Sequence, residues 1–216
     1  MYRVSYPTPS PVVAGTVSGV HTDRVIDLEE LRRDLGFSRT FSVNQIHSAT
    51  IVHTDQSTPG SSADAIMCSE TDILLGVFTA DCTPVLIYGH ELLAVIHAGW
   101  RGIHQRIFDV FFEELPVGVS NIHAIIGPTI CADCYEVGPE FAGYFSPPYL
   151  SPGNHGHWHL DLPELAYASL TRLGVSDDRI YRSPDCTCCT AIGLHSHRKT
   201  RTLLRNISYI GFRSSR

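Results

Sequence analysis

The sequence predicts an α+β fold in which mixed β-sheets pack as a sandwich with flanking helices, forming a single compact domain over residues 1–216. Three observations carry this prediction. Strand-like and helix-like segments alternate irregularly, hairpin connections join some of the strands, and no repeat, low-complexity tract or linker divides the chain. Such irregular alternation argues against a doubly wound parallel sheet, which is built from regular strand–helix units.

The composition is that of a globular protein and argues against two kinds of partner. The 216 residues are 43% hydrophobic and 18% charged, which provides enough apolar chain for a substantial core. The formal net charge is −6 and no basic block stands out, so nucleic acid is not expected as a partner. No apolar run approaches the roughly 18 residues of a membrane span, so we expect no membrane partner.

Cysteine usage and the first residues together predict a reducing location. The segment MYRVSYPTPSPVV lacks the apolar stretch of a secretory signal. Because seven is an odd number, the cysteines cannot all pair within one chain. We therefore expect a cytoplasmic protein with free or metal-bound thiols.

The N-terminal third is expected to hold strands around one well-capped helix. Asp27 fits an N-cap, Glu30 follows three residues later, and Gly36 ends a run of leucines at helical spacing. Outside this helix we expect extended chain over residues 1–22, a strand within 40–53 that is interrupted at 44–47, a loop over 57–62, and strands over 63–67 and 73–78.

A β-hairpin at the centre of the chain is the element around which the rest is organised. Two apolar, β-branched runs, Thr83–Tyr88 and Leu92–His97, are joined by Gly89-His90-Glu91, which is typical of a hairpin with a short loop. Centring the loop on its histidine pairs Thr83 with His97.

Cys82 comes just before this hairpin, near His97 at its open end, but regular strand geometry would separate the two side chains. Side chains alternate between the faces of a strand, so Cys82 in regular continuation would point away from the face that Thr83 shares with His97. The two can cooperate only where ladder pairing ends, and we therefore predict irregular backbone at Ala80-Asp81-Cys82.

The remaining chain is expected to add helices and short strands. One helix face over residues 103–115 is traced by apolar side chains and ends at Pro116, and a second helix begins at the capping pattern of Asp161 and Glu164 and ends at Gly174. The other expected elements are a strand over 122–126, a short helix from 138 through 145, a loop over 146–158 and a last strand over 207–212.

Three residues at strand ends or interruptions are candidates for chemistry: His47 in NQIH, Cys82 in TADC and His97 in HAGWRG. Two imidazoles and one thiolate suit zinc and leave a fourth coordination position for water or substrate. Spacing alone leaves ordinary roles open, because histidines at strand ends and single cysteines more often serve packing or the surface.

The motifs around these residues form a recognisable set. They are NQIHSATIV (44–52), ADA (63–65), FTADCTPVLIY (78–88), AVIHAGWRG (94–102), IGPTICADCYEVGPEF (126–141), LDL (160–162), CT (186–187), HSHRK (195–199) and RNIS (205–208). With these motifs in this order, the sequence resembles the YfiH-like laccase-domain family, whose members are also called polyphenol-oxidase-like or purine nucleoside phosphorylase proteins.

The resemblance implies both a metal site and a reaction. It places zinc at His47, Cys82 and His97, the positions that match the family's metal-binding motifs. It also implies an enzyme that takes purine nucleoside and phosphate as partners and converts adenosine, inosine or guanosine to base and ribose 1-phosphate. Adenosine deamination and methylthioadenosine phosphorolysis are further activities that the resemblance implies.

Four further side chains are candidates for roles around the metal. Arg101, beside the HAGW motif, is a candidate to bind phosphate, and Gln45 could bond a base edge or tie down its own loop. Arg198 matches an arginine of the family's C-terminal motif and is a third candidate for substrate binding. Asp81 could orient a ligand or act as a base, although an aspartate at a turn more often caps backbone N–H groups.

Alternatives to a catalytic zinc enzyme stay open at this point. A copper-dependent polyphenol oxidase would match the family's older name, but a blue-copper centre needs a weak axial ligand such as methionine, and the only methionines are Met1 and Met67. A cysteine hydrolase would use Cys82 as nucleophile and His97 as base. A non-catalytic zinc protein would close the site with a fourth ligand such as His53 or His195.

The other cysteines form two groups, Cys131-x-x-Cys134 and Cys186-x-Cys188-Cys189, that resemble the halves of a zinc ribbon. The second group is interpreted as lacking the usual two-residue gap. A second structural metal or a labile disulfide would require the two loops to meet, and we expect unligated thiols in turns instead.

The sequence departs from the family pattern in two places. His195 stands where the family usually carries an aromatic residue, and the segment Val12–His21 lacks the TRxGG-like and NLG motifs that commonly precede the first helix. If that segment helps to wall the pocket, we expect substrate preference to differ from that of other members.

Overall fold

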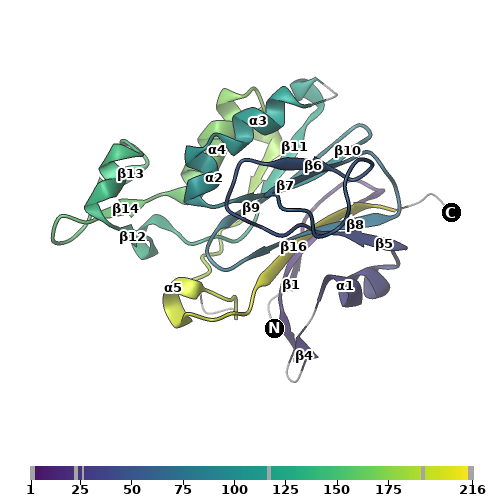
Figure 1. Cartoon of the computed structure of the whole chain (residues 1–216), viewed down its shortest axis with the longest axis horizontal. Helices are drawn as coiled ribbons and strands as arrows, with labels where there is room; N and C mark the ends of the chain where they lie inside the picture. The colour runs from purple at the N-terminus through teal and green to yellow at the C-terminus, as the bar shows by residue number, and fades with distance from the viewer. Residues whose placement is uncertain (1–2, 22–23, 26, 116–117, 191–192, 214–216) are drawn as a thin grey trace.

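The computed structural model describes residues 3–21, 24–25, 27–115, 118–190 and 193–213, and two mixed β-sheets packed face to face form its centre (Figure 1). One sheet has the strand order β1 (Arg3–Ser5), β2 (Val12–Ser18), β16 (Asn206–Phe212), β8 (Ile73–Thr79) and β5 (Arg39–Phe41). The other has the order β15 (Ile180–Arg182), β11 (His123–Ile126), β9 (Thr83–Gly89), β10 (Leu92–Ala98), β7 (Ala65–Cys68) and β6 (Ile51–His53).

Both sheets combine parallel and antiparallel pairs. The short strands β5, β6 and β15 join their neighbours in parallel, whereas the long central strands pair in antiparallel fashion. The predicted α+β sandwich with mixed sheets and flanking helices is therefore confirmed.

Helices cover the outer faces of both sheets, so the molecule has four layers (Figure 1). The helix α1 (Leu28–Leu35) packs on the five-stranded sheet, and α3 (Ile107–Glu113) and α4 (Leu162–Arg172) pack on the six-stranded sheet. A separate apolar cluster fills the space between the sheets, with members such as Leu75, Leu86, Val95 and Ile210. Because both faces are covered, every residue of β10 is buried, which explains its unbroken apolar run.

A small third sheet lies beside the sandwich, at the left of Figure 1. Its order is β12 (Glu136–Val137), β14 (Trp158–Leu160) and β13 (Leu150–Pro152), so the loop expected over residues 146–158 is in part strand. Leu150 and Leu160 are cross-strand partners and lie buried in an apolar cluster of their own. The pairing of these two leucines outweighs the Pro- and Gly-rich composition of the connection, which alone suggested a loop.

The caps of the two main helices are confirmed. The Asp27 carboxylate accepts a 2.7 Å hydrogen bond from the Glu30 N–H, and Asp161 accepts one of 3.0 Å from the Glu164 N–H. Gly36 ends α1 in the left-handed conformation, with a φ of 76°.

Three other helical segments differ from a regular α-helix. The single helix predicted over residues 103–115 is wrong, because Arg106 takes a φ of 65° and separates α2 (Trp100–His104) from α3. Pro116, expected to end it, lies outside the described residues. The short helix expected from residue 138 is a 3₁₀ helix, Pro139–Gly143, and α5 (His197–Thr200) is a single turn. Within the described residues, no helix combines the length and the apolar character that crossing a bilayer requires.

The central hairpin forms, but its predicted register is wrong by one residue. Gly89 pairs with Leu92, so the turn consists of two residues, His90 and Glu91, rather than three. Two-residue turns match the twist of hairpin strands, and Glu91 supplies a left-handed φ of 55°. As a result Pro84, rather than Thr83, lies opposite His97. A second hairpin, β3 (Val20–His21) with β4 (Arg24–Val25), precedes α1.

Candidate metal and active site

The three residues singled out as metal ligands converge at the end of β10. His47, Cys82 and His97 each offer a ligand atom, and these atoms lie within 4.8 Å of one another. The rings of His47 and His97 meet edge to face, with centroids 4.9 Å apart. His47 comes from the connection between β5 and β6, whereas Cys82 comes from the one between β8 and β9. Three segments distant in sequence therefore build one donor group.

The connection that carries Cys82 is irregular, as predicted. Residues 80–82 lie outside both strands, and Asp81 has a φ of 97°. The geometric objection to a joint site, that regular strand would turn Cys82 away from His97, followed from the register that is wrong by one residue. Pro84 lies opposite His97, and the irregular segment before β9 brings the Cys82 sulfur within 4.8 Å of the ligand atoms of His47 and His97.

Two glycines of the HAGWRG motif let the backbone approach this group closely. A Cβ on Gly99 would lie 3.0 Å from the Cys82 sulfur and 3.4 Å from Cδ2 of His47. A Cβ on Gly102 would lie 2.9 Å from the Ser48 carbonyl oxygen. The first residues of α2 therefore fit against the ligand loops only because these side chains are absent.

Asp64, which the sequence interpretation left without a role, organises the site from behind. Its side chain is fully buried and lies 2.8 Å from Nδ1 of His97. The same carboxylate accepts hydrogen bonds from the N–H groups of Ile46, His47 and Ser48 and from the Ser48 hydroxyl. One carboxylate therefore fixes the loop of one ligand and the ring of another, and leaves Nε2 of His97 for the site. The signal was an aspartate between two alanines at the start of a buried strand.

The charges of the group stabilise one another. Burial raises the pKa of the Cys82 thiol, but hydrogen bonds with His47 and His97 outweigh burial and lower the pKa to about 6. Burial lowers the pKa of His97, yet its bonds with Asp64 and Cys82 raise the pKa to about 9. Burial also opposes ionisation of Asp64, whose pKa falls to about 2 through His97 and Ser48. Near neutral pH the donors therefore include a thiolate, the form that binds metal.

Asp81 ties the surrounding loops together. One carboxylate oxygen accepts a 2.7 Å hydrogen bond from the Thr187 hydroxyl, and the other accepts one of 2.7 Å from the Arg198 N–H. Its carbonyl oxygen accepts from the Thr129 hydroxyl and the Ile130 N–H. Since both carboxylate oxygens serve protein donors, the capping role fits Asp81 better than that of a base.

The donor group opens into a cavity of about 580 Å³ that contains several cationic side chains. Arg101, Arg198 and Arg205 all line it. Arg101 stacks on Trp100 at 4.4 Å from the ring centroid, and no carboxylate forms an ion pair with it in the described parts of the chain. Arg198 donates one hydrogen bond to the Glu136 carbonyl. The cavity therefore places a group that could hold a metal ion beside guanidinium groups.

Gln45 lines the same cavity, but its amide is already engaged. Its Nε2 donates to the carbonyl of Phe78 and its Oε1 accepts from the N–H of Phe78, both at 2.8 Å. Of its two expected roles, these hydrogen bonds support tying the His47 loop to β8. Substrate binding by Gln45 stays a prediction, since Nε2 keeps a second N–H and Oε1 a second lone pair.

The two histidines considered as a closing fourth ligand lie outside the donor group. His53 pairs with Glu114 at 2.9 Å, and neither His53 nor His195 is among the residues whose ligand atoms lie within 4.8 Å of one another. Among the described residues, the group at this cavity has three members only, which is the number that catalytic zinc sites draw from the protein.

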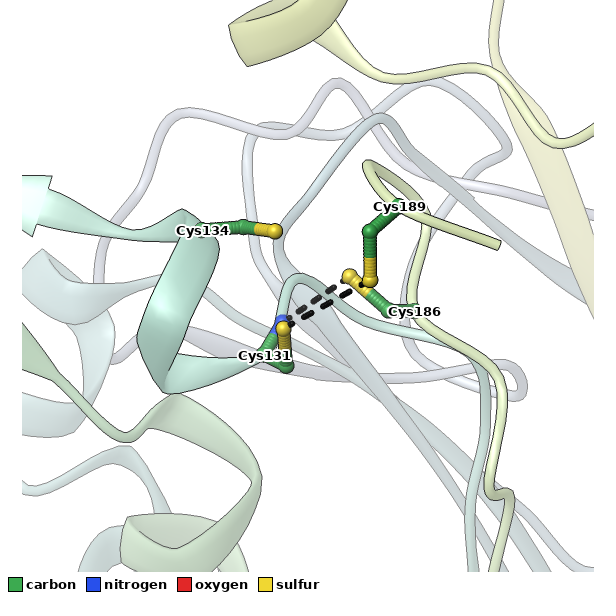
Figure 2. A group of neighbouring side chains, drawn as sticks. All are labelled: Cys131, Cys134, Cys186 and Cys189. Atoms are coloured by element: carbon green, nitrogen blue, oxygen red, sulfur yellow. Dashed lines mark hydrogen bonds between the residues drawn. The ribbon is translucent and has the colours of Figure 1, made fainter. Parts of the chain in front are cut away.

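Four of the other six cysteines lie together, so the condition set for a second metal or a disulfide, that the two loops meet, is fulfilled. The sulfur atoms of Cys131, Cys134, Cys186 and Cys189 lie within 4.8 Å of one another (Figure 2). The prediction that the second group lacks the two-residue spacing of a zinc half-site is wrong, since two residues separate Cys186 from Cys189. We call these four residues the cysteine cluster.

Known proteins are similar to this chain in fold and in sequence. An adenosine deaminase named RL5, from an unknown prokaryotic organism, is 34% identical over 148 residues, which cover 63% of this chain and 56% of that protein. A purine nucleoside phosphorylase of Deinococcus radiodurans is 32% identical over 207 residues, covering 87% and 79%. The crystal structure of YlmD from Geobacillus stearothermophilus superposes with a TM-score of 0.84 at 25% identity, covering 95% and 93%.

The family model extends over almost the entire chain. It matches residues 17–213, which include the three ligand candidates, the cavity arginines and the cysteine cluster. The resemblance that the motifs indicated is therefore confirmed. The chain belongs to the family of enzymes described as multi-copper polyphenol oxidoreductase laccase.

Proposed function

We propose that this chain is a zinc-dependent enzyme that cleaves purine nucleosides by phosphorolysis, with adenosine, inosine or guanosine as substrate. The products are the free base and ribose 1-phosphate. The observation that carries the proposal is the three-membered group of His47, Cys82 and His97 at the base of a cavity lined by arginines. The name of the relative from Deinococcus radiodurans supports the reaction class.

The donor set fits zinc better than copper. Two imidazoles and a thiolate are ligands that zinc accepts, and the Asp64 contact with His97 is the support typical of zinc histidines. A blue-copper centre would need a weak axial ligand such as a thioether. Met67 is buried with the residues that face α3 and α4 and is not among the residues that line this cavity. Bound zinc would polarise the substrate or lower the pKa of a coordinated water towards ~7.

The side chains of the cavity supply phosphate binding and hydrogen bonding. In phosphorolysis a phosphate oxygen attacks C1′ of the ribose, and the bond from C1′ to the base nitrogen breaks with its electrons moving onto the base. Arg101 can hold the phosphate because, within the part of the chain that the structure describes, no carboxylate forms an ion pair with its guanidinium. Burial raises the pKa of Tyr135 to about 12, so its hydroxyl keeps its proton and can donate to the substrate.

Deamination is the second candidate reaction, favoured by the relative named adenosine deaminase. It needs water instead of phosphate at the same metal, so one cavity can serve both reactions. Methylthioadenosine phosphorolysis would be the same bond cleavage on a modified ribose. Because none of the seven cysteines is joined in a disulfide, we propose that the protein works in a reducing compartment such as the cytoplasm.

The reaction is tested by incubating the zinc-loaded protein with adenosine, inosine and guanosine, with and without phosphate, and separating the products by chromatography. Release of adenine, hypoxanthine or guanine that requires phosphate supports phosphorolysis. Inosine formation from adenosine without phosphate supports deamination instead. Absence of turnover with all three nucleosides would contradict the proposal.

Variants and metal removal distinguish the zinc enzyme from a cysteine hydrolase and a polyphenol oxidase that would use the same residues. We expect His47→Ala and Cys82→Ala to lose both the zinc at this site and the activity, whereas Arg106→Ala, on the exposed bend between α2 and α3, keeps both. A cysteine hydrolase would instead retain turnover when zinc is removed by a chelator. A polyphenol oxidase would need added copper and a phenolic substrate.

A further inference from the structure

We propose that the cysteine cluster is a second metal site, which binds one Zn²⁺ through four thiolates and has a structural rather than a catalytic role. Figure 2 shows Cys131 and Cys134 on one loop and Cys186 and Cys189 on another, with the four sulfur atoms turned toward a common centre. This inference does not depend on the proposed function, because none of its ligands belongs to the group at the cavity.

The distances fit a tetrahedron of sulfur around zinc. With Zn–S bonds of about 2.3 Å, the edges of such a tetrahedron measure about 3.8 Å. The sulfurs of Cys131 and Cys189 lie 3.9 Å apart, and all four lie within 4.8 Å of one another. Only small side-chain movements would therefore complete the coordination.

The sequence spacing supports the same assignment. Both pairs have the form Cys-x-x-Cys, which is the spacing of structural zinc half-sites. In the first pair, the 3₁₀ turn Ala132–Cys134 brings the two thiols to one side. In the second pair, Cys188 lies between the ligands and is not part of the cluster, so it provides a natural control.

Backbone donors point at one sulfur of the cluster. The N–H of Cys131 lies 3.2 Å from Sγ of Cys186, and the N–H of Cys188 lies 3.3 Å from the same atom. A sulfur that receives two N–H groups is suited to carry the negative charge of a thiolate ligand. Cys186 is itself buried in the apolar cluster beneath the small third sheet, which excludes water from that side.

A pair of disulfides explains this arrangement less well. Four sulfurs that meet around one point match a single ion, whereas two disulfides require two separate pairs at bonding distance. The 3.9 Å between the sulfurs of Cys131 and Cys189 is far longer than a disulfide bond, which measures about 2.05 Å. Four close thiols that must share one pocket are most favourably satisfied by a cation.

The position of the cluster suggests what the metal would stabilise. It connects the chain after β11 with the chain after β15, where Thr129 and Cys186 already form an isolated bridge. Thr187, next to one ligand, donates to Asp81, and Tyr135, next to another, lines the cavity. A metal here would lock together the two loops that support one wall of the cavity.

The metal content of the full-length protein tests this proposal. We expect two zinc ions per chain by inductively coupled plasma mass spectrometry, one of which is lost in Cys131→Ser and in Cys189→Ser. The matched variant Cys188→Ser should retain both, and His47→Ala should lose only the other ion. Zinc contents of Cys131→Ser and Cys189→Ser equal to that of the unchanged protein would overturn the proposal.

A second measurement needs no variant and so does not depend on their folding. Alkylation of the zinc-loaded protein, followed by peptide mapping, should leave Cys189 unmodified although its side chain is exposed, while partly buried Cys188 reacts. After treatment with a chelator under reducing conditions, Cys189 should be alkylated faster than Cys188. Rapid alkylation of Cys189 in the zinc-loaded protein, or disulfides within the cluster, would contradict the assignment.

Discussion

Asp64 and His97 form a buried pair in which a carboxylate oxygen lies 2.8 Å from Nδ1, with side-chain exposures of 0% and 3%. The pair connects the start of β7 with the end of β10 and fixes the imidazole that completes the donor group. Because Asp64 also holds the loop of His47, its role extends to two of the three proposed ligands.

Replacing Asp64 by asparagine should weaken zinc binding more than it changes the fold. The amide keeps the shape of the carboxylate but cannot supply its charge to His97, so we expect zinc affinity to fall about 10–100-fold. Competition with a chromophoric chelator measures the affinity. Asp72→Asn, at an exposed carboxylate bonded to Ser38, is the matched control. Equal affinities for the two variants would contradict the role of Asp64.

In protein from which a chelator has removed the metal, Asp64 should also make the free energy of unfolding fall at low pH. Its pKa lies at about 2 in the folded chain, below the ordinary 3.8. A depressed carboxyl pKa contributes stability that is complete above the unfolded value and is lost as the pH falls through the folded value. The contribution is about 2 kcal/mol. Urea unfolding between pH 5 and about 2 should show this loss in the unchanged protein. If the unfolding free energy of Asp64→Asn falls with pH as steeply as that of the unchanged protein, the loss of stability in acid does not arise from this residue.

Gly99→Ala tests the close approach between α2 and the ligands. The added methyl would lie 3.0 Å from the Cys82 sulfur, so the thiol must move and its contacts with the histidines loosen. We expect at least a tenfold loss of zinc affinity with a change in unfolding free energy of about 1 kcal/mol. Gly118→Ala is the control, because it is also a helix-capping glycine and its nearest neighbour would lie 3.9 Å away. Unchanged zinc affinity in the Gly99 variant would show that the thiol position is not critical.

Arg101→Ala tests phosphate binding. Loss of a charged hydrogen-bond donor is worth about 1.5–3 kcal/mol, so we expect KM for phosphate to rise about 10–100-fold with zinc content unchanged. Arg106→Ala, whose guanidinium pairs with Asp109, should have ordinary kinetics. If the KM for phosphate is the same in Arg101→Ala as in the unchanged protein, Arg101 does not bind phosphate.

Local signals in the sequence were sufficient for the helix ends and for the central hairpin. The Asp27 and Asp161 caps formed as expected because a side chain and an N–H three residues apart decide them. The hairpin register could not be predicted to one residue, since turns of two and three residues fit the same loop. The bend at Arg106 was missed because apolar periodicity continues across it.

The site was predictable where motifs carried it and not where tertiary contacts did. His47, Cys82 and His97 were found from strand ends and from the family resemblance. Asp64 was missed because nothing local reveals that its carboxylate meets a histidine 33 residues away. The meeting of Cys131 with Cys189 likewise depends on two loops brought together by β11 and β15.

The central claim is that zinc held by His47, Cys82 and His97 is required for phosphorolysis. The most direct measurement is the rate of hypoxanthine release from inosine and phosphate as zinc is added back to chelator-treated protein, compared with Cys82→Ser. We predict that the rate rises with zinc to a plateau in the unchanged protein, that copper does not restore it, and that Cys82→Ser stays inactive. Full activity in the chelator-treated protein or in Cys82→Ser would contradict the account.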